Sequence, residues 1–254
     1  MTRPVWLVTV AVLLCGAAAR AQIVPSARAG QPRTGELDIA CGPRAVYGLP
    51  YMGLTILGSQ QGTMGLIAPY HGLVVNGGSN QGLKVGQEYY VRRVIPPMDR
   101  GNSRWQEIQA IGIHTAGWIR IVRVEGSRAV ADSVYACDGY EIGDYLEPYT
   151  PPSADPKAIP GGEPDYENPG VVLFGDDRRA MGAGTLLMVI DRGGDHGVKP
   201  GQQLTVYRRS LNGTGPIHSV ARGTAIAVMP ESSMVRLDGA RAEVYSGDLV
   251  ALHR

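Results

Sequence analysis

The feature of this sequence that most constrains its fold is a segment that occurs twice. GLKVGQEYYVRR begins at Gly82, and GVKPGQQLTVYRR begins 115 residues later at Gly197. A Gly-Asp pair near the end of each copy, at 143–144 and again at 247–248, recurs 104 residues apart. The difference of eleven residues lies in the polar stretch between these landmarks. The chain therefore contains a duplicated unit, and its fold should be sought as two versions of one structure.

The residues that recur are those of tight turns. In G-x-K-x-G-Q the glycines occupy positions where a turn needs a positive φ, which other residues adopt only at a steric cost. The lysine between them is expected to point into water. Four positions in each copy are predicted to be structural turns, namely Gly82, Gly86, Gly143 and Asp144, and Gly197, Gly201, Gly247 and Asp248. The duplication thus indicates architecture rather than an active site.

Short segments rich in β-branched and aromatic residues surround these turns. EYYVRRVI and GWIRIVRV in the first copy, and QLTVYRR in the second, are typical of strands. No apolar pattern with a period of 3.6 residues lasts longer than two turns of helix. The sequence therefore predicts an all-β fold, with two tandem small β-barrel-like or sandwich-like units joined by a proline-rich linker.

The first 21 residues have the pattern of a secretory signal peptide. Arg3 precedes an apolar run from Val5 to Leu14, and Ala19-Arg20-Ala21 provides a cleavage site. The run is shorter than the roughly 20 residues that a membrane-spanning helix needs. We expect cleavage after Ala21 and a mature protein without a transmembrane span, exported to the periplasm or the outer-membrane periphery.

Composition then divides the mature chain into four parts. Residues 22–36 are polar and predicted to be a disordered lead-in. The first β unit, with an N-terminal extension, is assigned to 37–149, and short strands and turns are expected over 37–69. Six prolines between 150 and 170 indicate a linker, since proline lacks the backbone donor that strands and helices use. The second β unit follows at 171–254.

Charge and cysteine content limit the partners and the chemistry. Without Arg3 and Arg20 the chain has 22 basic and 23 acidic residues, a net charge of −1, and nucleic-acid binding is not expected. Cys41 and Cys137 remain after cleavage. In an oxidising compartment they can pair as a disulfide, or they can remain buried thiols that pack as small apolar groups. Their spacing is not that of a metal site.

No catalytic, cofactor-binding or metal-binding residues are assigned, and the chain is predicted not to be an enzyme. The histidines form none of the paired spacings of metalloproteases. His196 lies beside Asp195, but the equivalent position in the first copy is Gln81, which favours a turn residue. The carboxylates that a glycoside hydrolase would need include Asp144 and Asp248, which occupy equivalent turns.

Aromatic side chains are the remaining candidates for a binding surface. Tyr90, Trp105 and Trp118 lie in or near the first copy and could stack on a sugar or a partner. The alternative is that these rings pack within the β unit, which is favoured because one face of each strand must be buried.

The repeated unit resembles the β module at the carboxyl end of flagellar assembly protein T. It is similar, more closely, to a tandem form of that module in exported bacterial proteins, where it often stands beside a peptidoglycan-binding LysM domain. The resemblance rests on the glycine-rich turn, TILGSQQG from Thr55, YACD from Tyr135 and GDYLEPY from Gly143. It covers roughly residues 50–150 and 170–254, although no LysM-like segment is recognisable before the first copy. It implies an envelope location and a non-enzymatic role, and it supplies no functional residues.

These observations together predict an exported structural or assembly protein of the cell envelope. It would act through protein–protein contacts of its tandem β modules, with other envelope proteins or with itself, because exposed strand edges of small barrels invite pairing with other chains. The alternative function is binding of peptidoglycan or another glycan.

Overall fold

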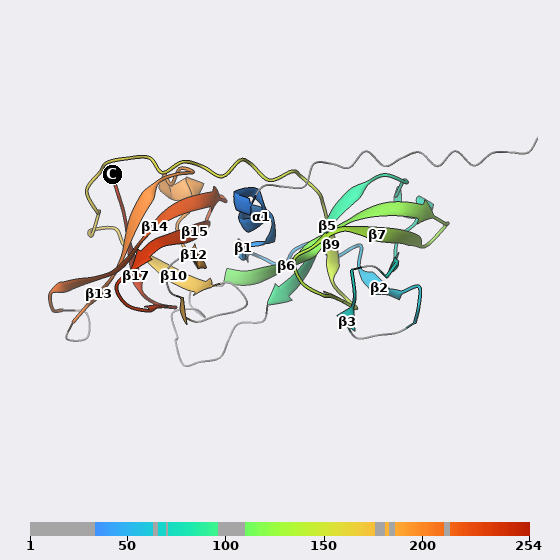
Figure 1. Ribbon diagram of the computed structural model, residues 1–254, viewed down its shortest axis with the longest axis horizontal. Helices are drawn as coiled ribbons and strands as arrows, with labels where there is room; N and C mark the ends of the chain where they lie inside the picture. Colours follow the sequence, from blue (N-terminus) through green and yellow to red (C-terminus); the bar gives the residue numbers. More distant parts are fainter. Residues whose placement is uncertain are drawn as a thin grey trace, which may run out of the picture. The chain divides into compact units, whose positions relative to one another are not determined.

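The computed structural model describes residues 34–62, 66–69, 71–95, 110–175, 181–182, 186–210 and 214–254 (Figure 1). The predicted signal peptide, most of the predicted lead-in and Trp105 lie outside these ranges. Strands dominate the described chain, so the all-β prediction is confirmed. None of the helices in these ranges has the length and apolar character that crossing a membrane requires.

The second copy is a closed six-stranded barrel. Its strands follow one another around the barrel in the order β10-β12-β15-β14-β13-β17. Their bounds are Gly170–Gly175 (β10), Leu187–Ile190 (β12), Gln203–Arg209 (β13), Ile217–Val228 (β14), Ser233–Ala240 (β15) and Leu249–Leu252 (β17). A two-stranded pair, β11 (Met181–Gly182) with β16 (Val244–Tyr245), lies outside this path. Aliphatic side chains such as Leu204, Val206 and Val250 fill the barrel core.

The first copy repeats this strand order. Its path is β2-β4-β7-β6-β5-β9, and a pair of β3 (Leu66–Ile67) with β8 (Tyr140–Glu141) matches the pair in the second copy. The strands of the path are β2 (Ile56–Ser59), β4 (Leu73–Val75), β5 (Glu88–Ile95), β6 (Ala110–Val124), β7 (Ala129–Ala136) and β9 (Tyr145–Pro148). The duplication seen in the sequence is therefore a duplication of topology.

Individual hydrogen bonds recur between the copies as well. The Ile56 amide donates to the Asp144 carbonyl (2.8 Å), and the Gly143 amide donates to the Ile56 carbonyl (2.9 Å). In the second copy the Val172 amide donates to Asp248 (2.9 Å), and Gly247 donates to Val172 (2.8 Å). These bonds join the first strand of each copy to its last, at the Gly-Asp turn that the sequence singled out.

Among the described residues, two elements of the first copy have no counterpart in the second, helix α1 (Thr34–Cys41) and strand β1 (Arg44–Tyr47), which pairs with β6. The prediction of short strands after Leu37 is wrong for residues 37–41, because they belong to α1. Leu37, Ala40 and Cys41 lie three and four positions apart, which places them on one side of a helix, and all three pack against aromatic rings of the first copy. Packing of this side against the aromatic rings stabilises the helix.

The two copies also contact each other directly, and residues 32–254 form one compact unit. One apolar cluster combines Ala45 and Ala110 of the first copy with Leu173, Phe174 and Val189 of the second. In addition, the Ser232 hydroxyl donates a 3.0 Å hydrogen bond to the Ala45 carbonyl. The copies are thus joined by a shared core and not only by the chain between them.

The proline-rich segment is held against the second barrel by backbone hydrogen bonds. The Ile159 amide donates to the Gly201 carbonyl (2.7 Å), and Asp165 donates to Leu252 (2.8 Å). Glu163 and Arg254 exchange two bonds of 3.0 Å each. Although its prolines keep it out of the sheet, the segment has a defined path along the barrel.

Candidate functional site

The repeated G-x-K-x-G-Q residues form the same pair of turns in both copies. A short 3₁₀ turn, η1 (Ser79–Gln81) or η3 (Gly194–His196), ends at a left-handed glycine, Gly82 with φ of 80° or Gly197 with φ of 79°. The following lysine is exposed in both copies, as predicted from its position between the glycines. The Gln87 side chain accepts a hydrogen bond from the Lys84 amide (2.8 Å), and Gln202 accepts one from Lys199 (3.0 Å). The repeated glutamine is therefore a cap for the turn.

His196 has the same structural task as its counterpart Gln81. Its Nδ1 accepts a hydrogen bond from the Gly193 amide (3.2 Å), and Gln81 Oε1 accepts one from the Gly78 amide (2.9 Å). Because an amide and an imidazole can both supply one acceptor at this place, the two residue types are interchangeable here.

Alanine substitutions at Gly82 and Gly78 should separate backbone strain from steric clash. A Cβ at Gly82 would meet nothing within 4 Å, so Gly82→Ala should cost only the left-handed backbone, roughly 1–2 kcal/mol of unfolding free energy. A Cβ at Gly78 would lie 2.1 Å from the Glu125 carbonyl oxygen. Because this is a backbone atom, relief requires moving the chain, and we expect a loss of roughly 3 kcal/mol. Urea unfolding of both variants tests whether Gly78→Ala loses more stability than Gly82→Ala. In the second copy, Gly193→Ala should likewise lose more stability than Gly197→Ala. Equal losses would contradict the close approach at Gly78.

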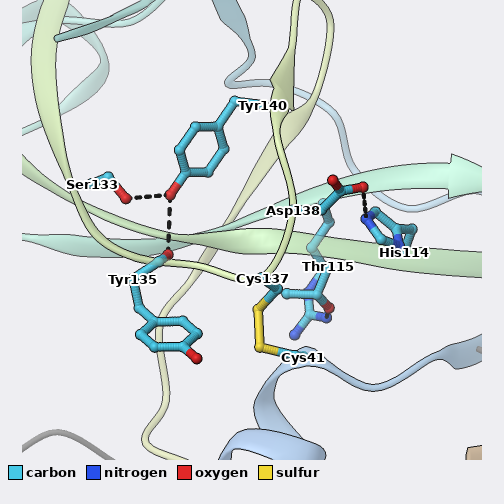
Figure 2. The surroundings of a disulfide bond; sticks show 9 residues. Cys41, His114, Thr115, Ser133, Tyr135, Cys137, Asp138 and Tyr140 are labelled. Atoms are coloured by element: carbon cyan, nitrogen blue, oxygen red, sulfur yellow. Dashed lines mark hydrogen bonds and ion pairs between the residues drawn. A yellow bond between two sulfur atoms is a disulfide. The ribbon is translucent and has the colours of Figure 1, made fainter. Parts of the chain in front are cut away.

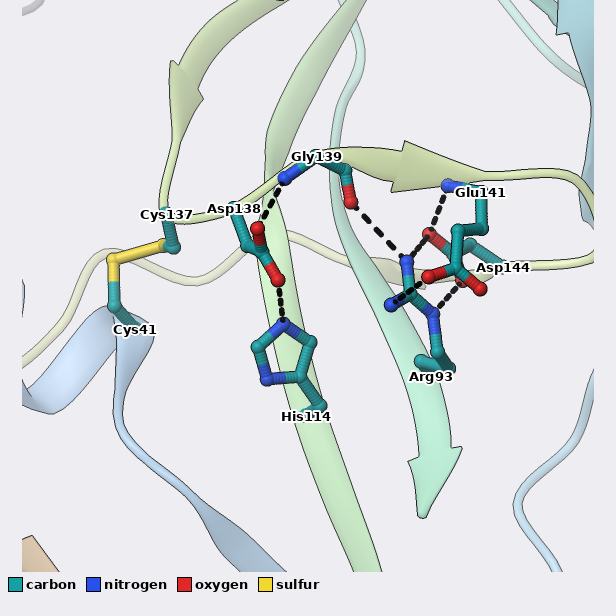
Figure 3. Close-up of polar contacts among 8 residues, drawn as sticks. All are labelled: Cys41, Arg93, His114, Cys137, Asp138, Gly139, Glu141 and Asp144. Carbon is teal, nitrogen blue, oxygen red and sulfur yellow. Dashed lines mark hydrogen bonds and ion pairs between the residues drawn. A yellow bond between two sulfur atoms is a disulfide. The ribbon is translucent and has the colours of Figure 1, made fainter. Parts of the chain in front are cut away.

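A buried arginine–aspartate pair lies at the Gly-Asp turn of the first copy (Figure 3). Arg93 Nε and Nη2 donate to the two carboxylate oxygens of Asp144, at 2.7 and 2.9 Å. The same carboxylate accepts the Glu141 amide (2.8 Å), and the Glu141 side chain lies 2.6 Å from Arg93 Nη1. Burial alone would lower the pKa of Arg93, but the hydrogen bond to Asp144 and the charges of Asp144 and Glu141 outweigh it and raise that pKa.

The second copy contains the same constellation. Arg208, 115 residues after Arg93, binds both oxygens of Asp248, at 2.5 and 2.7 Å. The Tyr245 amide donates to the Asp248 carboxylate (2.7 Å), as Glu141 does to Asp144. The predicted turn residues Asp144 and Asp248 are thus salt-bridge partners that also cap their turns. Sequence reasoning missed the two arginines, although their recurrence at the same offset was the available signal.

Because the shared polar groups have structural tasks, the places where the copies differ are the better candidates for function. One such difference is the face of the first copy that α1 covers. Trp118 stacks between Tyr135 and Tyr149, with ring centroids 4.8 and 5.4 Å away, and Tyr90 meets Trp118 edge-on at 6.2 Å. Burial raises the pKa of Tyr90 to about 12. We call these four rings the aromatic patch.

A disulfide between Cys41 at the end of α1 and Cys137 just after β7 fastens the helix over the aromatic patch (Figure 2). Ordered polar contacts hold the segment that follows Cys137. The Tyr140 hydroxyl donates to the Tyr135 carbonyl (3.0 Å) and accepts from Ser133 (2.6 Å). His114 Nε2 lies 3.3 Å from an Asp138 carboxylate oxygen. These contacts fix the position of the loop from which Cys137 bonds to the helix.

The same face of the second copy is polar and hollow. At the equivalent positions, Tyr90 is replaced by Thr205, and Trp118 by Arg222. The other replacements are Tyr135 by Gly239, Cys137 by Arg241 and Tyr149 by His253. Arg222, Gly239 and Arg241 are exposed and line a groove of about 350 Å³ on strands β13, β14 and β15, together with Asp238. We call this hollow the β14 groove.

The β14 groove has a positive balance of charge. It presents two arginines against one aspartate, Asp238, which accepts a hydrogen bond from the Thr224 hydroxyl. His253, the counterpart of Tyr149, lies 2.9 Å from the Thr205 hydroxyl. Burial, and secondarily the charge of Arg222, lowers the pKa of His253 below its usual value, which favours the neutral imidazole. The guanidinium groups therefore determine what this groove attracts.

The aromatic residues considered for binding lie mainly in the interior. Tyr90 and Trp118 are 6% and 3% exposed, which leaves little ring surface for a sugar, and Trp105 is outside the described residues. Within the ranges that the structure describes, no three His, Cys, Asp or Glu side chains gather as a metal site. No family model matches the chain, and no curated protein matches it either.

Proposed function

We propose that this protein is an exported structural or assembly protein of the bacterial cell envelope, and that it works by docking a segment of another protein chain in the β14 groove. The observation that carries the proposal is the equivalence of two faces. In the first copy this face binds a helical segment, α1, through packed rings and a disulfide. In the second copy the same strands carry a hollow with exposed arginines. Because this face of the module binds a segment of its own chain in the first copy, the same face of the second copy is suited to bind a segment of another chain.

The chemistry of the groove favours an acidic segment as its occupant. Arg222 and Arg241 would pair with carboxylates, because guanidinium groups bind carboxylate oxygens through paired N–H donors. Gly239 leaves room for the segment to approach, since a Cβ there would meet nothing within 4 Å. Complementary charge would also speed encounter and weaken with added salt.

The cellular setting of the proposal comes from the sequence. The pattern of a signal peptide supports export, and the resemblance to the carboxyl-terminal module of flagellar assembly protein T supports an envelope location and a role in assembly. The resemblance is one of fold and pattern, and it therefore supports a class of function without naming a partner.

A photo-crosslinking amino acid at position 240, an exposed alanine that lines the β14 groove, tests the proposal in intact cells and leaves both arginines in place. We expect one adduct of defined size from position 240 and none from position 127, which lies in an exposed turn of the first copy. Gly239→Tyr fills the groove with the residue type that the first copy has, and should abolish the adduct without unfolding the protein. Ser127→Tyr is the matched control and should leave it intact. An adduct that survives Gly239→Tyr would overturn the assignment of the groove.

Co-sedimentation with isolated peptidoglycan sacculi distinguishes this proposal from glycan binding. A protein that works through the β14 groove should remain in the supernatant. Saturable pelleting that persists in moderate salt and in the Gly239→Tyr variant would instead identify a wall-binding protein.

A further inference from the structure

A second hollow, of about 320 Å³, lies where the first copy, the start of the proline-rich segment and the second copy meet within the compact unit. Its lining includes Arg44, Arg92 and Glu147 at one side and apolar side chains such as Ile226 and Met234 at another. We propose that this hollow, the junction cavity, binds a small organic acid, with its carboxylate on the two arginines and its apolar body against the second copy. This inference is independent of the β14 groove and of any protein partner.

The first step is the burial of Arg92, whose side chain is only 2% exposed. Its guanidinium lies 4.3 Å over the ring of Tyr90, and Nη1 donates a 2.6 Å hydrogen bond to the Thr115 hydroxyl. Nε lies 2.7 Å from Glu147 Oε2 but in a geometry that makes an ion pair without a hydrogen bond. A buried guanidinium with incomplete hydrogen bonding is costly for a fold to keep. An anion in the adjoining cavity would complete it.

The second step is the charge balance of the cavity wall. Arg44 Nη1 lies 3.8 Å from Glu147 Oε1, so two arginines share one carboxylate. The Glu147 side chain is 43% exposed, and ion pairs that reach solvent in this way contribute little. Burial, and next the charge of Arg44, lowers the pKa of Arg92. One positive charge is thus left over on the cavity wall, and a single carboxylate would neutralise it.

The third step is the absence of such a site in the second copy. The residue equivalent to Arg92 is Tyr207, and the residue equivalent to Glu147 is Ala251. The shared fold therefore does not require a charged group at this position of the strand. Arg92 is a feature of the first copy alone, as is Arg44 on the added strand β1.

Size and lining define the ligand class. Ligand cavities of a few hundred Å³ with apolar walls and few polar groups hold small organic molecules. A medium-chain fatty acid has the required head and body, and so does the end of a peptide with an apolar last residue. Both sources share a carboxylate on an apolar body, and this is the chemistry that we assign.

Calorimetric titration of the purified protein with octanoate, octanol and octylamine tests the head group. We expect one octanoate per chain, octanol at least tenfold weaker and no binding of octylamine. Within the acids, each methylene added from butanoate to octanoate should tighten binding roughly fourfold. Equal binding of octanoate and octanol, or no binding of any acid, would overturn the proposal. Acetyl-alanyl-leucine, as the free acid and as the amide, identifies the source of the ligand. Tighter binding of the peptide acid than of octanoate would assign the site to the end of a peptide chain. Tighter binding of octanoate would assign it to a free organic acid.

Two variants with opposite expected signs exclude a merely structural role. Arg44→Gln should weaken octanoate binding about tenfold, because it removes one guanidinium. Glu147→Gln should tighten it several-fold, because it removes the carboxylate that competes for Arg92. Arg123→Gln is the control, since Arg123 has an equally loose pair with Glu125 (3.8 Å) but does not line the cavity. If Arg44→Gln and Glu147→Gln both weakened octanoate binding, or both tightened it, the assignment would be contradicted.

Discussion

Asp144→Asn is expected to lower the free energy of unfolding by about 3 kcal/mol, the lower end of the range for breaking a buried ion pair, because Glu141 remains 2.6 Å from Arg93 as a second counter-charge. The Asp144 side chain is 1% exposed and Arg93 is 14% exposed, so solvent cannot replace the lost carboxylate. Asparagine keeps one side-chain oxygen and has an NH2 group in place of the other, so either Arg93 Nε or the Glu141 amide would lose its acceptor. Urea unfolding followed by tryptophan fluorescence measures the change.

Two further variants calibrate this result. Asp248→Asn breaks the same pair in the second copy, where Arg208 is 36% exposed, and we expect a loss roughly half as large because water can solvate the freed guanidinium. Asp195→Asn changes an exposed turn aspartate and should shift stability by no more than about 0.5 kcal/mol. If Asp144→Asn behaved like Asp195→Asn, the pair would not hold the turn.

Removal of the disulfide is expected to cost about 4–5 kcal/mol at most, because the link between Cys41 and Cys137 closes a loop across 96 residues. The double variant Cys41→Ala/Cys137→Ala should unfold at lower urea concentration than the oxidised parent and should no longer respond to reductant. Reduction of the parent should produce the same shift.

Hydrogen exchange locates the effect of the disulfide. Without the bond, amides in α1 should lose protection first, since eight residues are too few for a stable helix in water. Amides of the second barrel should change little, except near Leu187 and Met234, against which Ile39 of α1 packs. Equal loss of protection in both copies would show that the bond stabilises the whole unit through the shared core instead.

The duplication could be predicted in detail because turns place local demands on sequence. A left-handed φ at Gly82 and Gly197 selects glycine wherever the turn occurs, so two copies that have otherwise diverged still agree there. The recurrence of one strand order in both copies is consistent with the same landmarks, but the order itself was not predicted. Even the exchange of Gln81 for His196 could be read as structural, because an unrelated residue type at the equivalent position argued against catalysis.

Helix α1, the β14 groove and the junction cavity could not be predicted in this way. The side of α1 that carries Leu37 and Ala40 is buried by aromatic rings from β5, β6 and β7, which lie far along the chain. A short segment with glycine and few periodic residues gives no helical signal on its own. The groove and the cavity depend on substitutions within strands, and these have meaning only after the strands are aligned in space.

The cluster of Ala45, Leu173 and Phe174, with the bond from Ser232 to Ala45, has a consequence for how this protein can evolve. Tandem modules that are connected by a linker alone can be gained, lost or exchanged between genes one at a time. Here each copy completes its neighbour's interior, so deletion of either would expose apolar side chains of the other. We therefore expect the two copies to be inherited together. The surface of the second copy can diverge, but the copy itself cannot be lost.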